Sequence, residues 1–484
     1  MNWLSRQMKG LTFGALALAM AQGASAQDTG KAERLHLSVE QMQLAAELNL
    51  RNGNVERALA FADALLGRDA QDVTALLIRS HALRMKGEFS PAQAAARTAW
   101  RLADSDNLKF NAATLMAQSL SSEGKRTRAQ LSLRRAREVA PTEQHAAQAA
   151  QDFRYVRQRN PWQTHLSFSL APNSNINNGS ANDRSVALYQ VFTPLFGSGT
   201  QVDLGASSQA LSGFEAGVDL QSRYRFHQTE RTAHDLRMGL SYRTYMLSNS
   251  AQNDFDAEDA DLVAQGRAPR DIKGSDYAYG TVQLGYGYKR LREDRRGEFS
   301  ATVDPGQSFY GDKRYQTYWR GGLGQSYYAS PTLKYTFGAE ADFRRAQRGI
   351  DYDRFSLRAG LNRRLANGNG LYLGAQASTL TSDNARAEYD ELRLSSGYVL
   401  GKDIMGTGLQ FGINTSFRDY DISPDDPSGR RDFTVGGQVT ATFRQIEYLG
   451  FNPTLSLEAT TTNSNIGRYD VDRIAVSVGI ASSF

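Results

Sequence analysis

The sequence predicts an α+β protein with two unlike domains: an N-terminal α-helical solenoid followed by a C-terminal 14-stranded antiparallel transmembrane β-barrel. Three observations support this class. A motif recurs about every 34 residues in the first third of the 484-residue chain. From Trp162 onward the apolar residues repeat with a period of two, in segments longer than the strands of a soluble sandwich. Tyrosine also divides the chain, since 21 of its 22 copies follow residue 160.

Residues 1–26 have the pattern of a signal peptide. Arg6 and Lys9 form a basic start, residues 10–20 are apolar, and Ala-Ser-Ala at 24–26 is a small-residue cleavage site. The apolar stretch is too short for a stable transmembrane helix. We therefore expect the chain to be exported from the cytoplasm.

Composition narrows the possible chemistry. The chain has no cysteine, which excludes disulfides, thiolate zinc sites and cysteine nucleophiles. Its net charge is +5, but export makes nucleic acid an unsuitable partner. We expect a protein held together by burial and hydrogen bonds alone.

Residues 27–159 are predicted to form the helical domain. Three segments align on a turn glycine, and each has an alanine five residues later; the glycines are Gly53, Gly87 and Gly124, and the alanines are Ala58, Ala92 and Ala129. A period near 34, with glycine between the helices and a small residue where they cross, resembles the tetratricopeptide repeat (TPR). Pro141 is expected to end the third helix pair. The resemblance implies a periplasmic scaffold or a concave peptide-binding surface.

One predicted helix carries a run of basic residues without an acid. They are Lys125, Arg126, Arg128, Arg134, Arg135 and Arg137. A solvated helix face is the favoured interpretation. The alternative is a surface for an acidic partner or for anionic headgroups.

Residues 160–484 are predicted to form the barrel. We expect fourteen strands, at approximately 162–171, 212–227, 233–247, 276–291, 297–309, 314–329, 331–346, 351–365, 370–381, 389–400, 406–420, 430–446, 452–463 and 469–484. With an even number of strands, the first strand begins and the last strand ends on the same side of the membrane. The connections after even-numbered strands are short, as periplasmic turns are, whereas the two longest, 172–211 and 248–275, both follow odd-numbered strands.

The last segment alternates to the end of the sequence, where Phe484 shares the apolar parity of Ile474 and Ile480. A closed barrel pairs its last strand with its first. A terminal aromatic at this parity resembles the signal by which outer-membrane barrels are recognised for insertion. We therefore expect contacts with barrel-assembly machinery and outer-membrane lipid.

The polar residues that alternate with the apolar ones along each strand are predicted to line a water-filled lumen. Their charged members include Arg223, Arg225, Arg237, Arg243, Glu340, Asp342 and Arg344. They would either define a selective passage or pair across strands and stiffen the wall.

No catalytic or metal motif is found. The six histidines form no HExxH or HxH pair and no nucleophile-elbow setting. Five carboxylates lie within residues 253–262, but without the glycine and the final glutamate of an EF-hand loop. A solvated outer loop is favoured there over a weak calcium site. We expect no enzyme activity, no metal and no cofactor.

The junction between the domains carries the most specific pattern. Trp162 opens an aromatic first strand, and Pro172, Asn173, Ser174, Asn175 and Asn177 follow within "APNSNIN". This stretch resembles the start of the barrel in the surface lipoprotein assembly modulator family, and residues 186–220 continue the resemblance. That family joins a periplasmic TPR-like domain to a 14-stranded barrel. For the Asn and Ser residues, turn capping and contact with cargo are equally open.

The resemblance implies an outer-membrane translocon. Such proteins deliver lipoproteins, or soluble iron- or haem-acquisition proteins, from the periplasm to the cell surface. Expected partners are this cargo and periplasmic chaperones. The alternative is a polysaccharide export porin with a periplasmic TPR scaffold, although 133 residues make a small scaffold and the basic helix does not suit cationic sugars. A barrel enzyme is a third, less favoured class.

Overall fold

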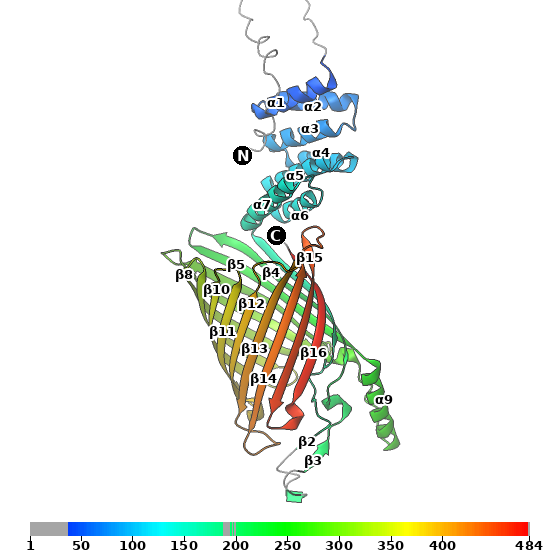
Figure 1. Cartoon of the computed structure of the whole chain (residues 1–484), viewed down its shortest axis with the longest axis vertical. Coiled ribbons are helices and arrows are strands. Elements are labelled where there is room, and N and C mark those ends of the chain that lie inside the picture. Colours follow the sequence, from blue (N-terminus) through cyan, green and yellow to red (C-terminus); the bar gives the residue numbers. More distant parts are fainter. Residues whose placement is uncertain (1–36, 187–193, 196, 198–199, 483–484) are drawn as a thin grey trace, which may run out of the picture.

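Two parts follow one another in the computed structural model, a stack of helices and a closed barrel (Figure 1). The structure describes residues 37–186, 194–195, 197 and 200–482. The predicted signal peptide and Phe484 lie outside these residues. No helix within them is long and apolar enough to cross a bilayer.

Seven α-helices precede the first strand among the described residues. They are α1 Val39–Arg51, α2 Val55–Arg68, α3 Val73–Lys86, α4 Phe89–Leu102, α5 Asp106–Ser122, α6 Arg126–Glu138 and α7 Glu143–Arg159. The first three pairs meet at Gly53, Gly87 and Gly124, whose φ angles of 76°, 86° and 89° lie in the left-handed region that glycine adopts without strain. The predicted crossing alanines are fully buried. The TPR-like architecture is thereby confirmed.

The seventh helix, α7, was not predicted as a separate element. Side chains cap the N-termini of α1, α3, α5 and α7, through Ser38, Asp72, Ser105 and Thr142, whereas α2, α4 and α6 lack such a cap. α7 therefore begins like the first helix of a further pair. Its Phe153 and Val156 complete a core cluster with α5 and α6, and it leads directly to the barrel.

Fourteen antiparallel strands close the barrel, as predicted. They are β1 Trp162–Asn173, β4 Gly213–Gln228, β5 Thr232–Leu247, β6 Tyr279–Leu291, β7 Glu298–Tyr310, β8 Lys313–Ser330, β9 Leu333–Ala346, β10 Tyr352–Arg364, β11 Gly370–Ser382, β12 Tyr389–Val399, β13 Thr407–Tyr420, β14 Arg430–Phe443, β15 Phe451–Ser464 and β16 Val471–Ser482. Each pairs with its neighbours in sequence, and β1 lies between β4 and β16. Closure leaves no exposed edge to the lipid.

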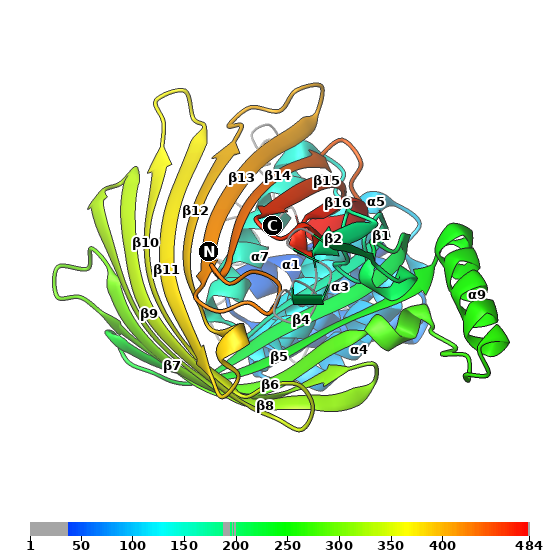
Figure 2. The same cartoon turned by 90° about the horizontal axis from the view of Figure 1, so that it is seen from below.

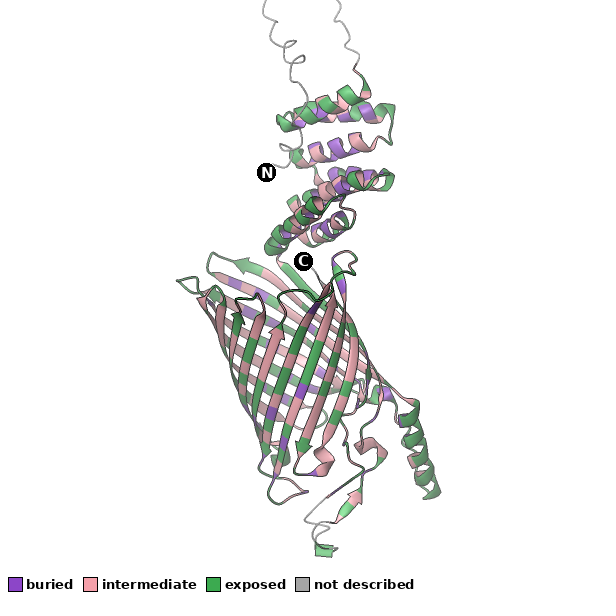
Figure 3. Ribbon diagram, in the orientation of Figure 1, coloured by how far each residue is buried: buried purple, intermediate pink, exposed green. Residues whose placement is uncertain are grey.

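The outer face of the barrel is apolar. Leu166, Phe168, Ile474, Val478 and Ile480, which share one parity on β1 and β16, are all about half exposed. Figure 3 shows that buried residues are concentrated in the helices and that few lie in the barrel wall. An exposed apolar band around a closed sheet is the lipid-facing surface of a transmembrane barrel.

The two ends of the barrel differ. The helical domain adjoins the end where β1 begins, here called the helical end; the opposite end is called the loop end (Figures 1 and 2). The long connections 174–212 and 248–278 both lie at the loop end. They include the short strands β2 Arg184–Val186 and β3 Gln201–Asp203 and the helix α9 Asn249–Ala264, which projects away from the wall.

The expectation of a solvated acidic loop at 253–262 is wrong, because these residues form most of α9. Ser248 caps the helix by accepting from the Ala251 N–H. Ala251 and Phe255 are buried against Ile176 and Leu211 of the preceding connection. Burial of this apolar stripe stabilises the helix, while most of its carboxylates point to solvent.

Candidate functional site

On the lumen-facing side of the strands, arginines form networks around buried carboxylates. Asp342 on β9 is fully buried and accepts from Arg320 at 3.4 Å, Arg344 at 3.0 Å and Arg354 at 3.4 Å. On the same strand, Glu340 lies within 3.9 Å of Arg320 and Arg354. Three neighbouring strands thus share one charge network.

Similar groups recur around the wall. Asp235 on β5 is contacted by Arg225 at 2.8 Å and Arg223 at 3.3 Å. The others are Asp304 with Arg237, Glu215 and Asp219 with Arg243, Glu391 with Arg393 and Arg418, Asp432 with Arg430, and Glu458 with Arg473. Every lumen charge named from the sequence therefore has an opposite charge beside it. Most of the pairs connect different strands, whereas Glu391 with Arg393 and Asp432 with Arg430 lie within one strand. The pairs between strands stiffen the wall.

The junction asparagines bind backbone at the loop end. Asn175 is 2% exposed, and its Nδ2 donates to the Gly179 carbonyl at 2.8 Å and to the Asp472 carbonyl at 3.2 Å. Asn177 donates to the Gln209 carbonyl at 2.7 Å and accepts from the Leu211 N–H at 3.0 Å. These side chains hold the connection after β1 in shape. Contact with cargo at these positions stays a prediction.

Asn173, Ser174 and Pro172 lie beside the last strand. The Asn173 amide donates to Glu215 at 3.0 Å. The Ser174 N–H donates to the Ile474 carbonyl at 3.0 Å, and the Ser174 hydroxyl accepts from the Ile474 N–H at 2.8 Å. Pro172 has no N–H to offer. Ser174 therefore fastens the end of β1 to β16 by one backbone bond and one side-chain bond, while Asn173 binds β4.

Trp162 marks the opposite end of β1. Its ring packs on Tyr224 of β4, with ring centroids 4.7 Å apart, and it is 41% exposed on the lipid-facing parity. Aromatic residues at this level typify the membrane interface. Just before it, the Asn160 side chain accepts from the Trp162 N–H at 3.1 Å and donates to Thr127 at 3.0 Å.

The basic helix is not simply a solvated face. Lys125, Arg128 and Arg135 are exposed, but Arg134 is 9% exposed. Its guanidinium donates to the Leu449 and Gly450 carbonyls at 2.8 and 3.1 Å. The favoured interpretation is thus wrong for Arg134, because the connection between β14 and β15 packs against the helix.

Further contacts complete this interface, which we call the β14–β15 latch and define as residues 444–450 with α6. Arg137 pairs with Glu447 at 2.8 Å, and Glu138 accepts from the Leu449 N–H at 2.8 Å. The Arg134 guanidinium also lies 4.1 Å from the centre of the Phe451 ring. Burial lowers the pKa of Arg134 to about 10, where it still carries its charge at neutral pH.

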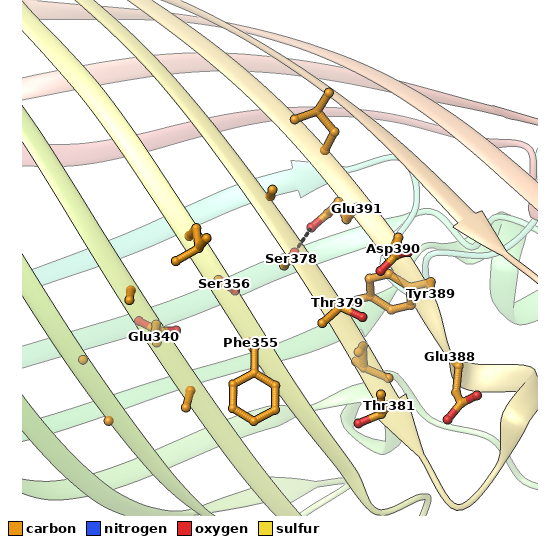
Figure 4. A pocket seen from close by; sticks show the side chains of 18 of the residues that line it. Glu340, Phe355, Ser356, Ser378, Thr379, Thr381, Glu388, Tyr389, Asp390 and Glu391 are labelled. Carbon is orange, nitrogen blue, oxygen red and sulfur yellow. Dashed lines mark hydrogen bonds between the residues drawn. The ribbon is translucent and has the colours of Figure 1, made fainter.

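A depression of about 1080 Å³ crosses strands β7 to β13. Its lining includes Leu323, Phe355 and Leu357, which share the lipid-facing parity, and also Glu340, Ser378 and Glu391 of the opposite parity. Figure 4 shows Phe355 and Asp390 in this part of the wall. The described residues contain no cluster suited to a metal ion.

Comparison with solved structures finds TPR proteins and outer-membrane barrels. The type III secretion translocator chaperone SycD of Yersinia enterocolitica is 17% identical, over 26% of this chain and 88% of that one, with a TM-score of 0.23. The TPR2B domain of yeast Sti1 is 17% identical, over 25% of this chain and 97% of that one, with a TM-score of 0.23. A BenF-like porin from Pseudomonas fluorescens is 11% identical over 66% and 98%, with a TM-score of 0.32. These similarities are weak, and no curated protein sequence matches the chain.

A closed 14-stranded barrel with an apolar outer face and a charged interior defines an outer-membrane β-barrel protein, here with an N-terminal TPR-like domain. Its location is the outer membrane of a Gram-negative cell. The profile of the surface lipoprotein assembly modifier family matches residues 162–484. The chain belongs to this family.

Proposed function

We propose that this protein is a translocon that moves a specific lipoprotein, or a soluble protein of the iron- or haem-acquisition type, from the periplasm to the cell surface. Family membership supports lipoprotein assembly at the surface as the general role. In this proposal the helical end faces the periplasm, periplasmic chaperones deliver the cargo, and the barrel-assembly machinery inserts the protein. The protein needs no cofactor and performs no catalysis.

The observation that carries the proposal is the attachment of the helical domain to the rim of the barrel. It is joined to β1 through Asn160 and to the connection between β14 and β15 through Arg134 and Arg137. A helical stack held in this way can present a bound protein to the barrel mouth, because its position relative to the wall is fixed on two sides.

The test is surface display of a co-expressed lipoprotein on intact cells. Antibody labelling is expected to be strong with the full chain and at background without it, while total lipoprotein is equal. Equal labelling of both strains would contradict the proposal. Loss of an exopolysaccharide on deletion, with unchanged display, would instead favour a polysaccharide export porin.

A further inference from the structure

Two turns at the helical end share one backbone geometry; they span residues 404–407 and 448–451. In each turn the first and last residues exchange two N–H to carbonyl bonds of 2.9–3.0 Å. The first central residue, Met405 or Leu449, has a φ of 51° in both turns, and a glycine at positive φ follows it. These are two-residue hairpin turns of type I′, for which asparagine and glycine are preferred.

A large aliphatic residue is unfavourable at this backbone, because its Cβ approaches the following carbonyl oxygen. The other described non-glycine residues at positive φ are polar; they are Asn178, Asp271, Arg295 and Asp312. Strained residues persist where the surrounding structure holds them, often at binding sites. For Leu449 the β14–β15 latch does so, because its N–H donates to Glu138 and its carbonyl accepts from Arg134.

Met405 instead displays its side chain. It is 93% exposed and Ile404 beside it is 53% exposed, and among the described residues this turn has no hydrogen bond to the helical domain. The Arg444 N–H donates to the Gly406 carbonyl at 3.0 Å, and the Arg444 guanidinium pairs with Asp403 at 3.1 Å. The exposed apolar turn is thereby held beside the latch.

Together the two turns form an apolar surface, which we call the rim patch and define as Ile404, Met405, Ile446 and Tyr448. The last two residues are 56% and 69% exposed. The other strand connections at this end carry no exposed large apolar residue; they are 229–231, 292–297, 331–332 and 365–369. Lipid surrounds all the turns of this end alike, so contact with lipid does not account for a patch confined to the latch turn and its neighbour.

The charges beside the rim patch that are left without a partner are positive. Asp403 and Glu447 are both engaged in ion pairs with arginines. Lys402, next to the patch, and Arg135, on α6, are exposed and form no ion pair within the described part of the chain. A molecule that covers the patch therefore meets apolar side chains flanked by basic ones.

We infer that the rim patch is a docking surface for the translocated protein, and that it binds a segment in which apolar residues are flanked by acidic ones. This inference rests on the proposed function. Exposed apolar patches with a polar border mark sites of protein interaction, and carboxylates of the segment complement Lys402 and Arg135. The position suits delivery, because the patch adjoins the latch that attaches the helical domain to the barrel.

Photo-cross-linking in lipid nanodiscs tests the contact directly. The chain has no cysteine, so Met405→Cys in the full chain can carry a thiol-linked benzophenone as its single label. Arg295→Cys is the matched control, because Arg295 is exposed, has a φ of 54° and lies in a polar turn of the same end. The probe is a purified lipoprotein whose surface display depends on this protein.

An adduct with the lipoprotein is expected at position 405 and not at position 295. Absence of an adduct at 405, equal adducts at both positions, or adducts only with phospholipid or with a second copy of this chain would overturn the inference. Adding Lys402→Glu should lower the yield at 405 severalfold, because the new carboxylate repels those of the segment. An unchanged yield would overturn the acidic part of the inference.

A second pair of variants tests the function of the patch in cells. Met405→Asn removes the apolar side chain and suits positive φ, so assembly of the barrel, checked by heat-modifiable gel migration, should be unchanged. Combined with Tyr448→Ser, it is expected to lower surface display at least about tenfold, because two apolar side chains that the segment covers are lost. Arg295→Asn makes a similar change in the polar turn and should leave display unchanged.

The two proposals fail in different ways. Normal display by the Met405→Asn and Tyr448→Ser double variant would overturn the inference, although the proposed function would stand. Background display of every tested lipoprotein in wild-type cells would instead overturn the proposed function.

Discussion

Single residues decide how charge is held in this protein. Asp342 is fully buried, yet it touches three arginines from three strands. Removal of one partner from such a group leaves a buried charge uncompensated, so the network fixes the positions of β8, β9 and β10 relative to one another. The arginines named from the sequence as a possible selectivity filter are thus also structural members of the wall.

His81 in α3 makes the helical domain sensitive to pH. Burial, with Arg84 nearby, lowers the pKa of His81 from 6.5 to about 4. Between these values the unfolded chain binds a proton that the folded domain does not, so the free energy of unfolding falls as the pH falls. The expected loss between about pH 7.5 and pH 5 is about 2 kcal/mol.

The measurement is urea unfolding of the helical circular dichroism signal, with the full chain in detergent. The His81→Gln variant should lose less stability than wild type over the same pH range. Identical losses in the two proteins would refute the assignment to His81.

Among the elements, the helix pairs show how local sequence sets geometry. Each pair needs one residue at positive φ, and each has glycine there. The strands show the opposite case. Their period of two locates the faces, but their partners are set by closure of the sheet, as in the sparse pairing of β1 with β16.

A glycine substitution tests the turn geometry. Gly87→Ala forces alanine into φ 86°, and we expect a loss of about 1–2 kcal/mol in the free energy of unfolding of the helical domain. Gly67 is the matched control: it lies in α2 in open space without positive φ. Gly67→Ala should stabilise by about 0.5–1 kcal/mol. Equal effects of the two substitutions in urea unfolding would contradict this account.

For the whole molecule, the position of the helical stack over the barrel depends on the β14–β15 latch. Arg134→Gln removes a charged donor from two carbonyls and is expected to weaken docking by about 2 kcal/mol. Spin labels at Leu131→Cys and Lys402→Cys should then give a broader distance distribution. Arg135→Gln, at an exposed arginine on the same helix, should leave it narrow. Broadening by both variants alike would argue against the latch.

Much of the architecture could be predicted because it depends on local patterns. The repeat of glycine and alanine located the helix pairs, and alternation located fourteen strands to within a few residues. The acidic segment 253–262 misled the prediction, because its charges concealed the burial of Ala251 and Phe255 that makes α9 a helix. Likewise, nothing local to Arg134 distinguishes it from the exposed Arg135.

The sequence by itself determined the helical and barrel parts and the face of each strand that meets lipid, because these follow from spacing along the chain. The family was indicated by the resemblance of the junction motif and is shown by the profile match to residues 162–484. Only the tertiary structure decided which residues pair across the chain. The contact of Arg134 with Leu449, and the bond of Ser174 to Ile474, join positions about 300 residues apart. Closure of the barrel brings such positions together, and no periodicity within a segment encodes that approach.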